Sequence, residues 1–208
     1  TSQDGRMHLR PAFTETDPAR IRAMIEQHPF GLLMTAHGGL DGSHIPFTLE
    51  TSGDAFVLCG HLAAANRQCA LLDGSLAMAV FTGPHAYVSP SWYTAQPSVP
   101  TWDYVAVHIH GVLSPMAHEP DIMDSLHTMA AHDPAQFDVR ALADRYRAMM
   151  LGGIRAFRLT PTRIEAQWKM SQNRSASDRR GVIVELRQHG GADEKQVADL
   201  IEAGLPAG

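Results

Sequence analysis

Residues 83–93 form the most informative stretch of this chain, and they read Gly-Pro-His-Ala-Tyr-Val-Ser-Pro-Ser-Trp-Tyr. Residues 99–104 continue in the same manner with Val-Pro-Thr-Trp-Asp-Tyr. Aromatic, hydroxyl and charged groups crowd together beside prolines, and a proline cannot donate a hydrogen bond to a neighbouring strand. We therefore expect rigid loops that hold a flat, partly charged ligand, rather than ordinary core strands.

A shorter block of the same kind lies at residues 168–174, which read Trp-Lys-Met-Ser-Gln-Asn-Arg. Gln172, Asn173 and Arg174 offer a dense set of hydrogen-bond donors where a strand is expected to end. Such a set favours the binding of an anion. The alternative is that these residues cap a helix that begins near Ser177.

Composition limits the classes of protein to consider. The 208 residues, 44% of them hydrophobic, suffice for one globular domain, expected over residues 7–208. Residues 1–6 resemble an added leader, with the native start at Met7. The net charge of −5, without a Lys/Arg run, argues against direct contact with nucleic acid. No apolar run has the length of a membrane span, and Cys59 and Cys69 form no disulfide framework, so we expect a cytoplasmic protein with reduced thiols.

Short strands and helices alternate along the chain. A first helix is expected from Asp17-Pro18, which supply a good N-cap and first helical residue, to Pro29. Strands are expected at residues 31–35, 45–49, 55–59, 76–81 and 104–113, with a closing hairpin at 154–159 and 164–170. Further helices are expected at residues 63–72 and around 122–129, 139–150, 182–186 and 197–201. This order predicts a small barrel in an α+β fold.

From Met7 to about Ile201 the chain resembles the PaiB-type FMN-binding split-barrel proteins, often labelled protease-synthase and sporulation regulators. The three blocks quoted above carry the resemblance. It is also carried by His-Pro-Phe at residues 28–30, by Gly-His-Leu-Ala-Ala-Ala-Asn at 60–66, and by Asp178 and Gly181-Val182. The resemblance implies a six-stranded split β-barrel with flanking helices, which forms a homodimer and holds its cofactor at the subunit interface.

Four positions depart from the family pattern. The family usually carries arginine at the position of Ala64, proline at Arg67, tryptophan at Cys69 and asparagine at Asp103. Loss of an arginine removes a phosphate partner from an FMN site, although Arg67 replaces it if both positions share one helical face. The carboxylate of Asp103 is costly to bury without a cation, which would be Arg174 or the ammonium of an amino-acid substrate.

One branch of this family, the piperazate synthases, binds haem b in place of flavin. Its members act in natural product biosynthesis and cyclise δ-N-hydroxy-L-ornithine to L-piperazic acid, forming an N–N bond with loss of water. The departures at Ala64 and Asp103, with short segments near Pro97 and residues 132–137, favour this branch. The resemblance then implies that His61 is the axial ligand of the haem iron. The other implied cofactor-binding residues are Asn66, Arg67, Trp92, Trp102, Gln172, Asn173 and Arg174. The implied catalytic residues are Lys169, Tyr93 and Asp103.

Each assignment has a structural alternative. His61 can instead hydrogen-bond to the backbone at a strand-to-helix turn. Lys169 is a general acid or base, or it pairs with a propionate or phosphate. Tyr93 and the two tryptophans near it wall the cofactor, or they line a dimer interface. His108 and His110 share one face of a strand, and a structural role is favoured for at least one of them.

Two other functions stay open at this point. The chain can be an FMN-binding regulator or sensor without turnover, or a haem-degrading or haem-carrying split barrel. We expect a small amino-acid-like substrate as its partner, and neither nucleic acid nor a membrane.

Overall fold

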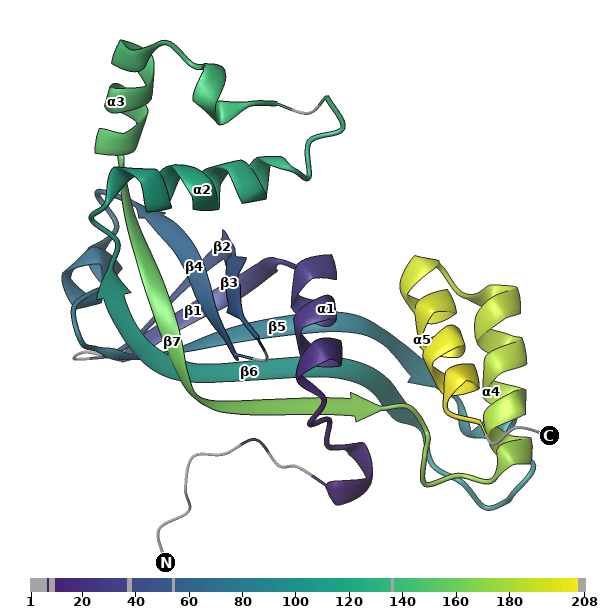
Figure 1. The fold of residues 1–208 in the computed structure, drawn as a ribbon. Helices are drawn as coiled ribbons and strands as arrows, with labels where there is room; N and C mark the ends of the chain where they lie inside the picture. The colour runs from purple at the N-terminus through teal and green to yellow at the C-terminus, as the bar shows by residue number, and fades with distance from the viewer. Residues whose placement is uncertain (1–6, 8–9, 37–38, 54, 136, 206–208) are drawn as a thin grey trace, which may run out of the picture. The chain divides into compact units, whose positions relative to one another are not determined.

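The computed structural model describes residues 7, 10–36, 39–53, 55–135 and 137–205 (Figure 1). The expected leader, residues 1–6, lies outside them. The strands are β1 (Phe30–Ala36), β2 (Leu40–Pro46), β3 (Thr48–Ser52), β4 (Ala55–Ala63), β5 (Leu76–Val88), β6 (Thr101–Pro115) and β7 (Ile154–Lys169). The helices are α1 (Pro18–Gln27), α2 (Glu119–Ala130), α3 (Asp144–Gly152), α4 (Ala176–His189) and α5 (Ala192–Ala203). The short 3-10 helices are η1 (Pro11–Phe13), η2 (Arg67–Leu71), η3 (Pro90–Trp92) and η4 (Val139–Ala141).

The strands of the described residues form one sheet in the order β2-β1-β5-β6-β7-β4-β3. The pairs β1–β2, β1–β5, β3–β4 and β4–β7 are antiparallel. The α+β class is therefore confirmed and the fold is of the split-barrel type, but the sheet has 7 strands and not the six that were expected.

The chain forms two compact units. Unit 1 comprises Thr1–Asp17, Thr82–Val107 and Glu165–Gly208, of which the structure describes the residues given above. Unit 2 comprises Pro18–Phe81 and His108–Ile164. Because β5, β6 and β7 are long, each contributes residues to both units. No helix among the described residues has the length and apolar character needed to cross a membrane.

Unit 2 contains an aromatic cluster beside the break between β2 and β3. The rings of Phe47 and Phe81 meet edge to face with centroids 5.2 Å apart, and Phe157 lies 6.3 Å from Phe47. The backbone N–H of Phe47 donates to the carbonyl of Pro29 at 2.9 Å, outside the sheet ladder. The single strand predicted at residues 45–49 is therefore wrong, because the chain divides there into β2 and β3.

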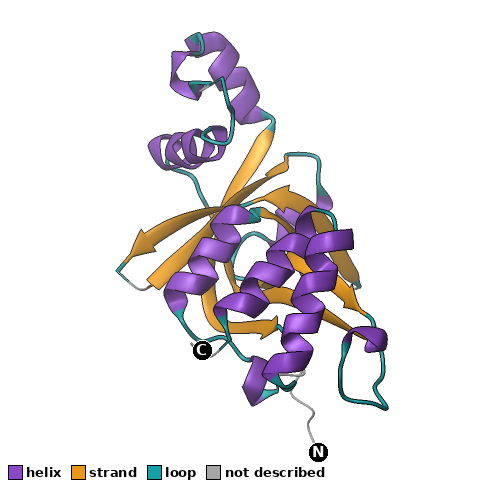
Figure 2. Cartoon of the chain, turned by 90° about the vertical axis from the view of Figure 1, so that its right-hand side faces the viewer, coloured by secondary structure: helices purple, strands orange, loops and turns teal. Residues whose placement is uncertain are grey.

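In unit 1, α4 and α5 lie side by side (Figures 1 and 2). Val182, Leu186, Val197 and Ile201 are buried, as the apolar spacing predicts. The predictions for α1 and α2 are also confirmed, in unit 2.

The expectation of loops at residues 83–88 and 101–104 is wrong. Residues 83–88 belong to β5, and residues 101–104 open β6. The reason is a period of two: Ala86 and Val88 are buried while Tyr87 between them is exposed. Between these strands, residues 89–100 are irregular apart from η3, so the expected loop is confined to that segment.

The predicted closing hairpin is also wrong, because residues 154–169 form one continuous strand. Turn residues at 160–162 are accommodated because β6 offers a glycine opposite them. A Cβ on Gly111 would lie 2.4 Å from the carbonyl oxygen of Thr160, so only glycine permits this approach. Thr162 Oγ1 then donates to the carbonyl of His110 at 3.2 Å.

Two helix predictions need correction. Ala63 still belongs to β4, and only residues 67–71 of the expected helix at 63–72 are helical, as the 3-10 helix η2. The expected helix at 139–150 is divided into η4 and α3, and α3 contains no buried residue.

Candidate functional site

The residues predicted to form the site fall into two groups. His61, Asn66 and Arg67 belong to unit 2. The other predicted residues belong to unit 1: Trp92, Tyr93, Trp102, Asp103, Lys169, Gln172, Asn173 and Arg174. Each group is described by itself.

A buried carboxylate lies at the centre of the unit 1 group. Asp103, on β6, has no solvent exposure, and its Oδ2 accepts a hydrogen bond of 2.6 Å from Ser171 Oγ. Lys169 Nζ, at the end of β7, lies 3.3 Å from Asp103 Oδ1. The same ammonium donates to Thr101 Oγ1 at 2.6 Å and to the carbonyl of Trp102. The cation beside Asp103 is thus Lys169, and the expectation of Arg174 in that place is wrong.

Burial raises the pKa of Asp103 above its ordinary value of 3.8. The hydrogen bond from Ser171 and the charge of Lys169 act in the opposite direction but do not outweigh the loss of water. A carboxyl with a raised pKa takes up a proton more readily than an exposed one. Asp103 and Lys169 therefore form a pair that can hold or pass a proton.

Ser171, two residues after the end of β7, is not among the residues predicted for the site. Its φ is 53°, in the left-handed region that non-glycine residues rarely adopt, and it is buried. This conformation directs the hydroxyl onto Asp103. A positive φ at a serine leaves no signal in the sequence, so the contact is visible only in the structure.

Tyr93 and Arg174 pack together elsewhere in unit 1. The guanidinium carbon of Arg174 lies 4.1 Å from the centroid of the Tyr93 ring, and Arg174 Nη1 donates to Ser98 Oγ at 3.4 Å. The hydroxyl of Tyr93 is buried and forms no hydrogen bond with the described residues. A buried phenol usually has a partner, so Tyr93 keeps the capacity to bind a group from outside the chain.

Gln172 completes the end of β7. Its Nε2 donates to the carbonyl of Trp168 at 2.6 Å, and its Oε1 accepts from the N–H of Met170 at 2.7 Å. Asn173 is exposed. Helix α4 begins at Ala176 with Ser175 as its N-cap, one residue before the expected start near Ser177.

The aromatic residues have different surroundings. Trp102 is 54% exposed, with Tyr87 and His85 at centroid distances of 5.9 and 6.1 Å. Trp92 is half-buried in η3, and its carbonyl oxygen would lie 2.3 Å from a Cβ on Gly181. Gly181 in the family motif therefore permits α4 to approach η3.

Asp178 of the same motif fastens α4 to the segment after η3. Its Oδ1 accepts from Thr94 N and Thr94 Oγ1, each at 2.7 Å, and from Ala95 N at 3.2 Å. These hydrogen bonds lower the pKa of Asp178 to about 2, and the bond from the Thr94 side chain contributes most. Asp178 and Gly181 thus have a clear structural role, which the motif alone did not reveal.

In unit 2, His61 lies within β4, opposite Ala156 of β7. The residue is half-buried, and loss of water lowers its pKa below the ordinary value of 6.5. Its ring forms no hydrogen bond or ion pair with the described residues. The alternative role, a bond to the backbone at a strand-to-helix turn, is therefore wrong. His61 offers a neutral imidazole, the form that binds a metal.

Asn66 and Arg67 are already engaged in unit 2. Asn66 Oδ1 accepts from Gln68 N at 2.9 Å and its Nδ2 donates to Ser43 Oγ at 2.9 Å, so Asn66 caps η2. Arg67 is paired with Asp41, and its side chain is 80% exposed. The idea that Arg67 replaces an arginine at position 64 from the same helical face fails, because the helix begins only at Arg67.

The remaining histidines considered above have protein partners. Arg163 Nη2 lies 3.2 and 3.1 Å from the two ring nitrogens of His110. His108 is half-buried and also has a partner. Within the described residues, no group of three or more His, Cys, Asp or Glu side chains is placed to hold a metal ion. Iron bound by one histidine of a haem protein needs no such group.

Comparison with known proteins gives the family. Residues 7–163 match the family model described as "Putative FMN-binding domain". The chain is 31% identical over 203 residues to the protease synthase and sporulation protein PAI 2 of Bacillus subtilis, with 94% of this chain and 97% of that protein covered. A second relative, the uncharacterized protein AN0679 of Emericella nidulans, is 28% identical over 243 residues and covers 94% of this chain and 96% of its own.

Two solved structures share the fold at low identity. The flavocytochrome Anf3 from Azotobacter vinelandii has a TM-score of 0.60 at 13% identity, over 79% of this chain and 73% of its own. The FAD and heme binding protein from Mycobacterium smegmatis has a TM-score of 0.57 at 16% identity, over 75% of this chain and 73% of its own. The family match over residues 7–163 and the likeness to PAI 2 lead to one conclusion: this chain belongs to the PaiB-type FMN-binding split-barrel family.

Proposed function

We propose that this protein binds haem b through His61 and cyclises δ-N-hydroxy-L-ornithine to L-piperazic acid. The observation that carries the proposal is the state of His61. Burial disfavours the protonated ring, and no described residue occupies either nitrogen. A lone pair kept free in this way fits an axial iron ligand.

Two further observations support haem over FMN. Ala64 replaces the arginine usual in the family, and Arg67 is engaged by Asp41, so neither position supplies a free cation for a flavin phosphate. The names of the two similar structures state that one binds FAD and heme and that the other is a flavocytochrome. A fold of this type therefore accommodates haem in other proteins.

Haem iron, when bound, would supply a Lewis acid that makes the hydroxyl of the substrate hydroxylamine a better leaving group. The α-amine forms the new bond to the hydroxylamine nitrogen as the N–O bond breaks. The hydroxyl and one hydrogen of the α-amine leave as one water, and no oxidant is needed. Both nitrogens belong to one substrate molecule, so ring closure gains from proximity.

Residues of unit 1 are proposed to accept and relay the proton of the substrate's α-ammonium. The α-ammonium must lose a proton before its nitrogen can attack. Asp103, whose pKa is raised, is a candidate to accept this proton, and Lys169, 3.3 Å away, is a candidate to relay it. Tyr93, with its unpartnered hydroxyl, is a second candidate donor to the substrate, and Arg174 is a candidate partner for its carboxylate.

The first experiment is a titration of the haem-free protein with hemin, followed by visible absorption. We expect a sharp Soret band that is lost in His61→Ala and retained in His132→Ala, an exposed histidine of the same unit. A flavin spectrum after addition of FMN, with no saturable hemin binding, would overturn the haem proposal.

The second experiment tests the reaction. The haem-loaded protein is incubated with δ-N-hydroxy-L-ornithine, and piperazic acid is measured by mass spectrometry. Asp103→Asn should weaken substrate binding more than hemin binding. Equal substrate affinity in this variant would remove Asp103 from the site, and release of biliverdin with a reductant would indicate haem degradation instead.

A second candidate is an FMN-binding regulator without turnover. It is favoured by the description of the family model and by the sporulation protein PAI 2 as a relative. For either function we propose a homodimer with the cofactor at its interface. Light scattering of the haem-free and loaded protein would measure the mass.

A further inference from the structure

A cavity of about 440 Å³ in unit 1 is lined by residues of the N-terminal segment, β6 and β7, among them Lys169. Its wall includes Arg10 and Phe13 from the N-terminal segment, Trp102 and Tyr104 from β6, and Gln167 and Lys169 from β7. We call it the Trp102 cavity. Its size is in the range typical of small-molecule sites.

The charge on the wall is positive. Arg10 is exposed, and its guanidinium forms no ion pair or hydrogen bond with the described residues. Lys169 is neutralised in part by Asp103, whose Oδ1 lies 3.3 Å from its Nζ. The free cation is therefore Arg10, whose planar fork matches a carboxylate.

The wall also holds a hydrogen-bonding group with spare capacity. Gln167 is 4% exposed, and its Oε1 accepts from Tyr104 Oη at 2.9 Å. The other end of this amide has no partner among the described residues. An almost buried amide that is bonded at one end and borders a cavity is suited to fix the orientation of a polar ligand.

A flat apolar surface completes the cavity. The indole of Trp102 is 54% exposed, which is unusual for tryptophan, and Tyr87 contacts it edge to face. A ring lying against the indole would remove this apolar surface from water, and the arrangement of paired aromatic rings is favourable in itself.

We propose that the Trp102 cavity binds a small aromatic carboxylate, with Arg10 as the partner of the carboxylate and Trp102 as the surface for the ring. The site differs in chemistry from that for the proposed substrate, because an ornithine derivative has no aromatic ring to lie against Trp102. The proposal needs only residues of unit 1 and no haem.

Isothermal titration calorimetry of the haem-free protein with benzoate tests the proposal. We expect saturable binding that is at least tenfold weaker in Arg10→Gln and unchanged in Arg180→Gln, an exposed arginine of α4 outside the cavity. Benzamide, which has the ring without the charge, should bind at least tenfold more weakly than benzoate. L-Ornithine should not compete with benzoate.

Tryptophan fluorescence gives an independent readout. Benzoate should change the emission of the wild-type protein, and the change should disappear in Trp102→Phe. Benzoate binding should persist in His61→Ala, so that failure of the haem proposal and failure of this one are separate results. The proposal would be overturned by the absence of saturable binding, by equal affinity in the two arginine variants, or by benzamide binding as tightly as benzoate.

Discussion

Ser171 Oγ donates a hydrogen bond of 2.6 Å to Asp103 Oδ2, and both residues are buried. The bond joins the irregular segment after β7 to β6, and Ser171 has a positive φ of 53°. With Lys169 on the other carboxylate oxygen, Asp103 has a partner on each oxygen. This arrangement makes a fully buried acid possible at this position.

Removal of Lys169 should cost more stability than removal of the charge of Asp103. Lys169→Met leaves a buried carboxyl without its cation, and we expect a loss of about 3 kcal/mol. Asp103→Asn should be nearly neutral, and Lys169→Met should cost little in that background. Urea unfolding of the two single variants and the double variant measures the coupling. Equal losses for Lys169→Met in both backgrounds would contradict an interaction between the side chains.

The same pair predicts a pH dependence. The pKa of Asp103 is raised in the folded protein, so its contribution to stability is fully present below the unfolded value of 3.8 and is lost as the pH rises through the folded pKa. The melting temperature of Asp103→Asn relative to wild type should therefore increase as the pH rises from 3.8. If the difference between the two melting temperatures stays constant as the pH rises from 3.8, Asp103 has an ordinary pKa.

Asp178 should show the opposite dependence. Its pKa is lowered to about 2, chiefly by the Thr94 side chain, so the stabilisation is present above 3.8 and is lost as the pH falls toward 2. The melting temperature of wild type should fall more steeply than that of Asp178→Asn over this interval. Thr94→Val, which removes one of the hydrogen bonds, should give an intermediate slope.

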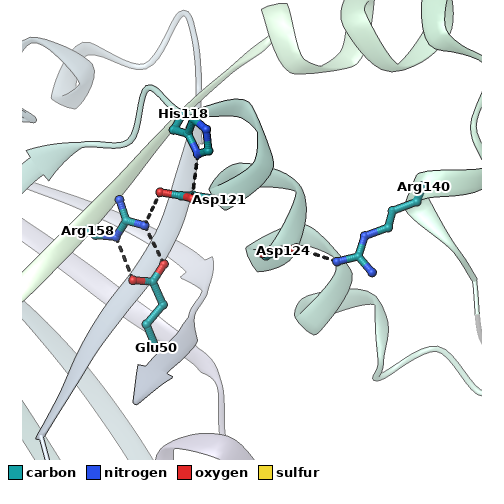
Figure 3. Close-up of polar contacts among 6 residues, drawn as sticks. All are labelled: Glu50, His118, Asp121, Asp124, Arg140 and Arg158. Carbon is teal, nitrogen blue, oxygen red and sulfur yellow. Dashed lines mark hydrogen bonds and ion pairs between the residues drawn. The ribbon is translucent and has the colours of Figure 1, made fainter. Parts of the chain in front are cut away.

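Arg158 should anchor α2 to the sheet in unit 2. It donates to both oxygens of Glu50 on β3, at 2.8 and 2.9 Å, and to Asp121 on α2 at 2.8 Å (Figure 3). Arg158→Met should cost about 1 kcal/mol, as expected for partly exposed ion pairs. It should also speed hydrogen exchange in α2. The pKa of Glu50 is lowered chiefly by its hydrogen bond with Arg158, and that of Asp121 chiefly by its hydrogen bond with His118 and then by that with Arg158. The loss of stability in Arg158→Met should therefore vanish as the pH falls below 3.8.

Arg140 supplies the matched control for Arg158. Its pair with Asp124 spans 2.6 Å and both side chains are largely exposed (Figure 3). Arg140→Met should change stability by no more than a few tenths of a kcal/mol, roughly the lower limit for surface pairs. Equal losses in the two variants would contradict a special role for the Arg158 contacts.

Gly111 should not tolerate a side chain. A methyl group there would meet the Thr160 carbonyl oxygen at 2.4 Å and Leu159 Cδ2 at 2.5 Å. Gly111→Ala should lower the free energy of unfolding by about 2 kcal/mol, because the neighbouring backbone must move. Gly152→Ala is the control, since nothing lies within 4 Å of its Cβ position, and it should be neutral or stabilising by about 0.5 kcal/mol. Chemical denaturation measures both.

Local sequence determined the helices with clear apolar spacing. Pro18 at the start of α1 and the stripe of Ile21, Met24 and Ile25 predicted that helix correctly, because a helix of this kind depends on residues three and four apart. The family motifs also sufficed to identify the fold class. Local sequence failed for β7, because Pro161 resembles a turn and the glycine that accommodates it lies fifty residues away on β6.

For the candidate site, too, some properties follow from the sequence and others only from the tertiary structure. The chain itself specified which polar residues are candidates for the site, including Asp103 and Lys169. Only the tertiary structure decided that Lys169 and Ser171 bond to this acid and that Asn66 and Gln172 are used within the protein. It also decided that His61 has no hydrogen bond or ion pair with the described residues. The physical reason is that burial and pairing depend on residues distant in sequence. The fold therefore sets the pKa of a side chain and decides which of its hydrogen-bonding atoms are left without a partner.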